Sequence, residues 1–169
     1  MPEQSKLIEE LKWRLDNYRL DEEELDFQQE RLERLNAKML EVGAQVITDL
    51  PRTPSPEPDR ITDYILKKEE LVKSTGALLE RHQNERELIE RLVMQSLRQP
   101  SQRAVIRIRF LDAKSWNDVV DIMFGGRPDY TAKEEAYLRR AFRLQEDALK
   151  NMADFISQST DKKILSWIM

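Results

Sequence analysis

The sequence predicts an all-α protein: a long antiparallel helical hairpin of coiled-coil character, followed by a C-terminal helix-turn-helix unit. Three observations predict this class. Charged residues make up 36 % of the 169 residues and glycine occurs only 4 times, which is typical of long helices. The prolines cluster at a few breaks and leave long segments between them uninterrupted. In the first of these segments, apolar residues recur at intervals of seven.

The breaks divide the chain. Four prolines stand between Pro51 and Pro58, where the rings exclude a helix. Pro100 marks a second break, and Pro128 a third. The predicted divisions are a hairpin at 1–98 with a proline-rich linker at 48–59, a helix-turn-helix domain at 99–157 and an apolar tail at 158–169.

The first predicted helix, from about Gln4 to Ile47, carries a regular apolar stripe. Its members are Leu11, Tyr18, Leu25, Leu32, Met39 and Val46. A seven-residue repeat keeps one face toward a partner helix when helices supercoil. We interpret the stripe as a hairpin or oligomerisation seam, because so narrow a stripe cannot stabilise a solitary helix in water. The pattern leaves open whether the seam closes within one chain or between two.

The second predicted helix, from about Arg60 to Leu97, supplies a natural partner. Its apolar residues fall mostly on one side: Ile61, Ile65, Val72, Leu79, Ile89 and Val93, with Leu71, Leu78, Leu88 and Leu92 widening the face. The linker can reverse the chain, which gives an antiparallel pair. The single histidine, His82, lies on or beside the seam. We interpret it as a polar residue that sets register rather than as a pH sensor.

Three helices, each shorter than the two helices of the hairpin, are predicted after Pro100. The first covers Ser101–Leu111, and the second begins at Ser115, which is placed to cap it. Gly125 and Gly126 are expected to end the second helix by adopting positive φ. Thr131 and Glu134 form a predicted capping box for a long helix that reaches about Phe155 or Ile156. The buried face of the second helix is expected to comprise Trp116, Val119, Val120 and Met123.

Two short helices, a turn and a longer basic helix are typical of a helix-turn-helix DNA reader. Basic residues and one tyrosine crowd the first half of the long helix, where arginine side chains pair with phosphates or guanine edges. Residues 98–150 hold 11 basic and 8 acidic side chains, a net charge of +3, whereas residues 1–97 hold 15 and 22, a net charge of −7. The net charge of −4 for the whole chain therefore does not argue against a nucleic-acid partner.

Other classes are disfavoured by what the sequence lacks. With no cysteine and one histidine, the chain has no thiolate zinc site, cysteine nucleophile or Ser-His-Asp relay. We therefore expect no enzymatic activity, cofactor, metal or small-molecule substrate. No apolar stretch approaches the ~20 residues that span a bilayer, and no signal peptide is recognisable. We expect a cytoplasmic protein without a membrane partner.

The stretch from Arg107 to Val120 contains Arg-Phe-Leu, then Lys114-Ser115-Trp116 and an acidic-hydrophobic run. It resembles the signature of sigma-70 region-4-like helix-turn-helix regulators. Phages and mobile elements of Gram-positive bacteria encode these proteins, which include late transcription regulators of the RinA and ArpU type. The segment Leu138–Leu149 resembles the recognition helix of that family, with Gln145 in place of a frequent histidine. The resemblance is best over residues 103–152.

The resemblance implies a sequence-specific transcription regulator of a prophage or mobile element in the bacterial host cytoplasm. Its partners would be double-stranded DNA, a second copy in a homodimer and, in one version, RNA polymerase. Carried over by position, Arg139, Arg140 and Arg143 would face DNA, while Lys114 and Ser115 would contact its backbone. The complete set of candidate DNA-binding residues is Lys114, Ser115, Arg127, Lys133, Tyr137, Arg139, Arg140 and Arg143.

The main alternative is a phage-encoded interaction or packaging adaptor whose helical arm binds another protein. The apolar tail Ile164–Met169 allows two interpretations as well. It is either a docking peptide or a segment folded back on the hairpin, and we favour the second because exposed tryptophan and isoleucine are costly in water.

Overall fold

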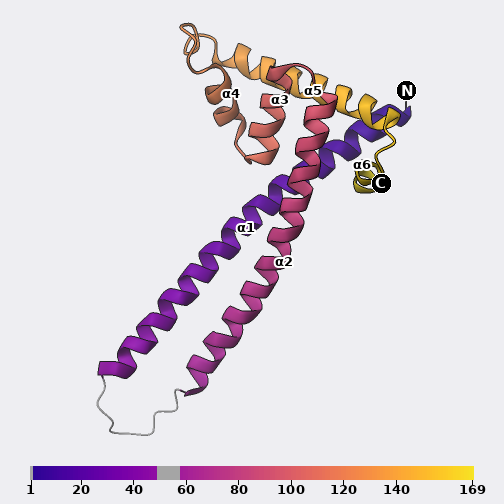
Figure 1. The fold of residues 1–169 in the computed structure, drawn as a ribbon. Coiled ribbons are helices and arrows are strands. Elements are labelled where there is room, and N and C mark those ends of the chain that lie inside the picture. The colour runs from indigo at the N-terminus through magenta and orange to yellow at the C-terminus, as the bar shows by residue number, and fades with distance from the viewer. Residues whose placement is uncertain (1, 49–57) are drawn as a thin grey trace. The chain divides into compact units, whose positions relative to one another are not determined.

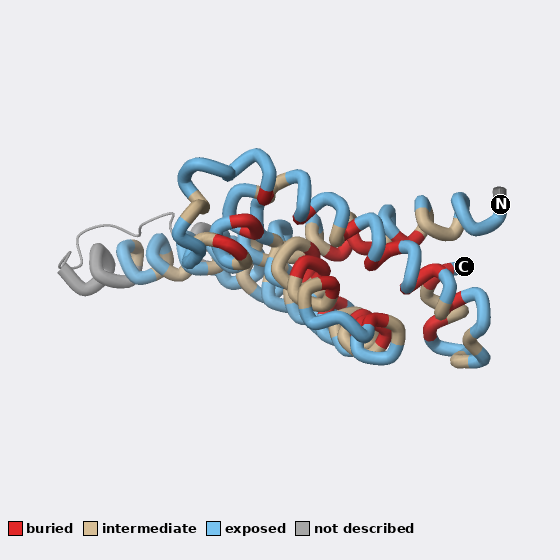
Figure 2. The backbone as a smooth tube through the Cα atoms, turned by 90° about the horizontal axis from the view of Figure 1, so that it is seen from above, coloured by how far each residue is buried: buried red, intermediate tan, exposed pale blue. Residues whose placement is uncertain are grey.

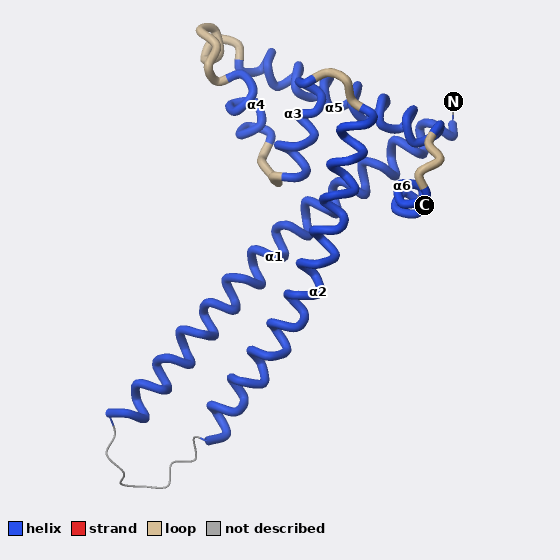
Figure 3. The backbone as a smooth tube through the Cα atoms, viewed as in Figure 1, coloured by secondary structure: helices blue, strands red, loops and turns tan. Residues whose placement is uncertain are grey.

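The structure, a computed structural model, describes residues 2–48 and 58–169, and within them the side chains of residues 3–42 and 62–169. This described part is all-helical, which confirms the predicted class (Figure 3). The elements (Figure 1) are α1 (Pro2–Thr48), α2 (Pro58–Ser96), α3 (Pro100–Ile106), the π-helix η1 (Arg107–Leu111), α4 (Trp116–Phe124), α5 (Glu134–Gln158) and α6 (Lys162–Ile168). The predicted linker falls almost entirely outside the described residues.

The seam between α1 and α2 closes within one chain. Tyr18 stacks on His82 with ring centroids 4.0 Å apart, and the Thr75 hydroxyl donates to Gln28 Oε1 at 2.8 Å. These pairings fix an antiparallel arrangement of the two helices. The predicted α1 stripe is confirmed where side chains are described, with Leu11 and Tyr18 buried and Leu25, Leu32 and Met39 half-buried. Val46 lies outside the described side chains.

The chain folds into two compact units. One comprises the residues up to Glu22 together with His82–Met169, and we call it the core unit. The other comprises Glu23–Arg81, and we call it the arm unit. The division differs from the predicted boundary at residue 98, because both ends of the hairpin belong to the same unit as the C-terminal helices.

The hydrophobic core lies in the core unit (Figure 2). Leu11 and Leu15 of α1 join Ile89, Leu92 and Val93 of α2 there, all fully buried. The other helices of the unit contribute Val105, Ile106, Phe110, Leu111, Val119, Ala148, Leu149, Met152, Ile156, Ile164 and Ile168. Full burial of one such aliphatic side chain stabilises the fold by ~1.5–3 kcal/mol. Helices as short as α3 and α4 depend on this shared core.

The arm unit is built differently. No described side chain in this unit is fully buried, and its seam consists of half-buried residues such as Leu71, Thr75 and Leu78. Ile65, Val72 and Leu79, which were predicted to face α1, lie at the edge of the seam, since these side chains are 42 %, 48 % and 44 % exposed and the first two line a groove with Met39 of α1. The α2 side of the seam includes the polar residue Thr75. Its hydrogen bond to Gln28 helps to set the register of α2 against α1, which the positions of the apolar residues alone do not determine. Ile61 lies outside the described side chains.

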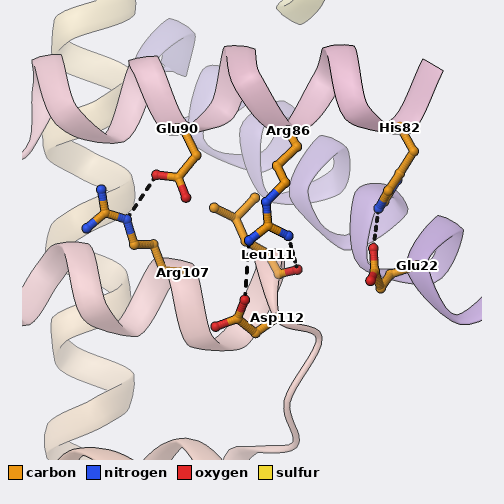
Figure 4. Close-up of polar contacts among 7 residues, drawn as sticks. All are labelled: Glu22, His82, Arg86, Glu90, Arg107, Leu111 and Asp112. Atoms are coloured by element: carbon orange, nitrogen blue, oxygen red, sulfur yellow. Dashed lines mark hydrogen bonds and ion pairs between the residues drawn. The ribbon is translucent and has the colours of Figure 1, made fainter. Parts of the chain in front are cut away.

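The predicted helix Ser101–Leu111 changes its winding partway. It is α-helical to Ile106 and then a π-helix, in which the Asp112 amide donates to the Arg107 carbonyl at 2.9 Å. Ala113 follows with φ of 54°, a left-handed conformation that ends the segment. Side chains of α2 bind this region, as Figure 4 shows. Arg86 donates to the Leu111 carbonyl at 3.1 Å.

Two further ion pairs join α2 to the same region. Arg107 Nε lies 3.0 Å from Glu90 Oε2, and Arg86 Nη2 lies 3.4 Å from Asp112 Oδ1 (Figure 4). The charge of Arg107 is therefore paired within the fold. These contacts hold the start of the C-terminal helices against α2.

One predicted cap is confirmed and another is wrong. Ser115 Oγ accepts a hydrogen bond from the Asp118 amide at 3.2 Å and donates to Asp118 Oδ2 at 2.8 Å. Thr131 does not cap α5, which begins at Glu134 after Lys133, without a side-chain cap. The chain from Arg127 to Lys133 instead forms successive turns, whose backbone hydrogen bonds continue to the start of α5.

Gly125 ends α4, but not by the predicted positive φ. Its φ is −58°, and the described glycines include none with positive φ. Glycine is needed there for space: a Cβ would lie 2.4 Å from the Asp121 carbonyl oxygen.

The tail folds back, as preferred from the sequence. Asp161 caps α6, accepting a hydrogen bond from the Lys163 amide at 2.9 Å, and Ile164 and Ile168 are buried in the core. Trp167 Nε1 donates to Glu85 Oε1 at 2.8 Å. The apolar side of the tail is thus covered by the chain itself.

Candidate nucleic-acid interface

A small aromatic cluster fixes the turn between α4 and α5. Phe124, at the end of α4, stacks on Tyr137 of α5 with centroids 4.9 Å apart. Val120 and Ala141 complete the buried part of this cluster. The apolar residues recur at helical spacing on both helices, so α4 and α5 pack where the chain turns. This packing positions the polar side chains around the turn.

Tyr137 is a structural residue, which corrects its prediction as a DNA contact. The side chain is only 8 % exposed, and its hydroxyl donates to Asp129 Oδ1 at 2.6 Å. This hydrogen bond, together with burial, raises the pKa of Tyr137. The same hydrogen bond lowers the pKa of Asp129, helped by Lys133, whose ammonium lies 3.3 Å from Asp129 Oδ2. Lys133 therefore also takes part in holding the turn.

Two arginines converge on the Phe124 ring. The guanidinium carbon of Arg127 lies 5.6 Å from the ring centroid, and that of Arg140 lies 5.4 Å from it. Arg127 also lies 5.7 Å from the Tyr137 ring. Aromatic faces attract such cations and hold them in place without neutralising them. Two positive charges are consequently concentrated beside the turn.

The two remaining α5 arginines extend this positive group. Arg139 and Arg143 are exposed and one helical turn apart, so they share a face. Arg139 pairs with Glu135 at 3.3 Å, an exposed ion pair of a kind that contributes little to stability and exchanges readily. Arg143 makes no ion pair within the described part of the chain. We call Arg127, Arg139, Arg140 and Arg143 the arginine group.

Lys114 and Ser115 are not part of this group. They precede α4, whose nine residues extend ~13 Å, whereas Arg127 follows it. Lys114 is exposed, and its carbonyl accepts a hydrogen bond from Arg109 at 2.9 Å. The Ser115 hydroxyl is engaged in capping. Of the eight predicted residues, six lie at the α4–α5 turn and in the first half of α5: the cations Arg127, Lys133, Arg139, Arg140 and Arg143, and the buried Tyr137.

Sequence reasoning missed Asp129 and Phe124, which hold the site together. No periodicity reveals that Asp129 in the turn accepts the Tyr137 hydroxyl. An aromatic residue at a helix end, with Arg127 three residues later, is the only available signal for Phe124 in the sequence. Gln145, which the sequence resemblance aligned with a frequent histidine, is buried.

Comparison with known proteins leaves the resemblance without independent support. No protein-family model matches the chain, and neither do any of the curated proteins or solved structures with which it was compared. None of the described helices is long and apolar enough to cross a membrane. The described residues contain no cluster of three or more histidine or acidic side chains suited to a metal ion.

Proposed function

We propose that this chain is a DNA-binding transcription regulator that contacts double-stranded DNA through the arginine group. The observation that supports this most is the convergence of Arg127 and Arg140 on Phe124, beside exposed Arg143. Like charges held this close create a local positive potential that favours phosphate. The start of α5 would then lie at the DNA, as in a helix-turn-helix reader.

The proposed regulator would act at promoters of a prophage or mobile element. In the fullest form of the proposal, it would act there together with RNA polymerase. Both belong to the resemblance of Arg107–Val120 and Leu138–Leu149 to sigma-70 region-4-like regulators. Selection of tight-binding sequences from a random duplex pool tests sequence specificity. Recovery of a common motif is expected, and a pool that stays random after selection would contradict it.

The binding itself is tested by fluorescence anisotropy with a labelled mixed-sequence duplex of about 30 base pairs. Affinity should fall steeply between about 50 and 200 mM salt. Arg140→Ala combined with Arg143→Ala should weaken binding about tenfold or more at moderate salt. The salt dependence should also become shallower, by about one unit of slope for each phosphate that the variant no longer neutralises.

A matched control is Lys162→Ala combined with Lys163→Ala, two exposed residues of α6. This control removes the same charge away from the arginine group and should leave affinity nearly unchanged. Equal losses of affinity for the two double variants would show that DNA binding depends on the net charge of the protein and not on the arginine group. Absence of binding by the folded protein at low salt would refute DNA binding.

A further inference from the structure

A groove in the core unit lies between the first half of α1 and the middle of α5, and residues of η1 and α4 also line it. Its volume is about 760 Å³, within the range of about 300–1,000 Å³ that is typical of small-molecule sites. One helical turn beyond the groove, Gln4 of α1 donates a hydrogen bond to the carboxylate of Asp154 of α5. This contact joins the two helices that form the walls.

The apolar lining of the groove is largely aromatic. Trp116 and Phe142 pack edge to face, with ring centroids 4.6 Å apart, and Phe142 is 39 % exposed. The guanidinium carbon of Arg109 lies 5.0 Å from the centroid of the Trp116 ring, which holds this cation at the groove. The other apolar lining residues are Ile8, Phe110 and Leu149. Such a lining favours a ligand that contains a flat ring.

The charged lining favours an anion. Its members are the cations Lys12, Arg19, Arg109 and Lys150 and the acids Asp16 and Glu146. Asp16 Oδ1 lies 3.9 Å from Arg19 Nε, so these two charges offset each other and three cations stand against one acid. Lys12 and Lys150 lie on opposite walls, and neither makes an ion pair within the described part of the chain.

Gln145 is the one uncharged side chain with a carboxamide in this lining. It is only 8 % exposed, and its Oε1 is enclosed without a hydrogen-bond partner. Its amide nitrogen makes no hydrogen bond to any described residue either. The terminal torsion of glutamine is broad and nearly two-fold, so either the acceptor or the donor end can face the groove. A buried carboxamide without a partner destabilises the fold, and its place here points to a ligand with polar atoms.

We propose that this groove binds a mononucleotide. The base would lie against Trp116 and Phe142 with a polar atom of its edge hydrogen-bonded to Gln145, and the phosphate would lie between Lys12 and Lys150. Gln145 and Lys150 are separated by ~7.5 Å along the axis of α5, a span comparable to that from base to phosphate. A simple aromatic acid lacks the polar ring edge, and inorganic phosphate lacks the ring.

This site goes beyond the proposed function and does not depend on DNA binding. The arginine group lies at the α4–α5 turn and in the first half of α5, and none of its four members lines the groove. The two sites can therefore be tested separately.

Isothermal titration calorimetry of the full chain with AMP, GMP, CMP and UMP tests the proposal, because every base has polar atoms on its edge. At least one of the four should bind with a Kd below about 1 mM. The corresponding nucleoside and inorganic phosphate should each bind about tenfold more weakly or less. If none of the four binds, or if either part alone binds as tightly as the nucleotide, the proposal is overturned.

Two variants test the contacts. Lys12→Gln with Lys150→Gln should weaken nucleotide binding about tenfold or more, since both charges that face the phosphate are removed. Gln145→Leu should also weaken binding, but its Tm should equal or exceed that of the wild type, because leucine leaves no buried polar group without a partner. A lower Tm with unchanged affinity would show that Gln145 has a structural role and would overturn its assignment.

The matched control is Lys162→Gln with Lys163→Gln, two exposed residues of α6 outside the groove. It removes the same charge and should bind the nucleotide like the wild type. Equal losses for the two lysine pairs would overturn the proposal. All four lysines are exposed, so this comparison decides the matter even if Gln145→Leu does not fold.

A resonance of the groove gives a local measurement. Of the three tryptophans, only Trp116 lines the groove. Its indole N–H signal should shift on titration with the nucleotide, while that of Trp167 in α6 should stay unchanged. A shift confined to Trp167 would contradict the proposed site.

Arg140→Ala with Arg143→Ala separates this proposal from DNA binding, because arginines also attract phosphate. This variant should keep its nucleotide affinity while its affinity for duplex DNA falls. If both affinities fall together, the arginine group is the nucleotide contact and the groove proposal fails. If the wild type binds the nucleotide but no duplex, the groove site stands and the proposed function fails.

Discussion

The hydroxyl of Tyr137 shows why a residue with suitable chemistry for DNA contact serves another purpose here. Its sequence neighbours are basic, and tyrosine is common at phosphate contacts. The ring, however, lies on Phe124, and the hydroxyl reaches Asp129, eight residues earlier. Only the path of the turn brings these two groups together. The arginines could be anticipated from their residue type, but the partners that hold them could not.

Tyr137→Phe removes this hydrogen bond while keeping the ring. We expect a lower denaturant midpoint near neutral pH, with the arginine group still in place. Because the pKa of Asp129 is lowered in the folded state, the contribution of its carboxylate is present above the ordinary aspartate pKa of ~3.9 and is lost as the pH falls through the lower, folded-state value. The difference between wild type and variant should therefore shrink on acidification. A difference that is unchanged at low pH would contradict this assignment.

Tyr18 gives a second, alkaline signature. Burial in the seam raises its pKa from 10.0 to about 12. In the unfolded chain the phenol ionises near pH 10, whereas in the folded chain it stays neutral, so its contribution to stability is complete below pH 10 and is lost as the pH rises toward 12. Chemical denaturation at pH 9 to 11.5 should show a smaller loss of stability for Tyr18→Phe than for the wild type. Identical losses of stability for the two proteins would show that the Tyr18 hydroxyl is exposed to solvent in the folded state.

Among the helices, those with periodic apolar faces were predictable and their ends were less so. The long helices α1 and α2, the helix α4 with its Ser115 cap, and α5 follow from spacing, breaks and capping residues. The π-helix was not predictable, since it depends on Arg86 and Glu90 of α2 binding Leu111 and Arg107. Ile65, Val72 and Leu79 were predicted at the centre of the seam but lie at its edge, because polar seam residues such as Thr75 carry no hydrophobic signal.

The two predicted caps give a matched pair of variants. Ser115→Ala removes an observed cap of α4 and should cost about 1 kcal/mol of stability. Thr131→Ala should be nearly neutral, because Thr131 is exposed and α5 begins without its help. Equilibrium urea denaturation of both variants measures the difference. A greater loss of stability for Thr131→Ala than for Ser115→Ala would support the capping box that the sequence predicted for α5.

For the whole molecule, the class followed from the sequence but the grouping of segments did not. Composition and breaks predict helices and a C-terminal set of three. They do not reveal that Leu11 and Leu15 complete the core of that set, because this depends on pairing between distant segments. The candidate DNA site was predictable only in its charged members.

This grouping predicts which fragments fold. Residues 99–157 alone lack the core residues of α1 and α2 and should be largely unfolded. Residues 1–22 joined through a short Gly-Ser linker to residues 82–169 should fold cooperatively, since Glu22 and His82 already contact each other across the cut (Figure 4). Thermal unfolding followed by circular dichroism compares the two. A cooperative transition in the 99–157 fragment would make the helix-turn-helix segment an independent domain.

The interrupted core unit also determines when the protein can complete its fold during synthesis. The first residues of α1 leave the ribosome early, yet their partners Ile89, Leu92 and Val93 and the C-terminal helices follow much later. At ~5–20 residues per second, the delay is on the order of ten seconds. During that time the arm unit, whose contacts are between nearby segments, can form its hairpin. Closing the hairpin holds Glu22 near His82 and removes most of the chain entropy that would oppose the late pairing. The arm unit thus prepares the assembly of the core unit, which it interrupts in the sequence.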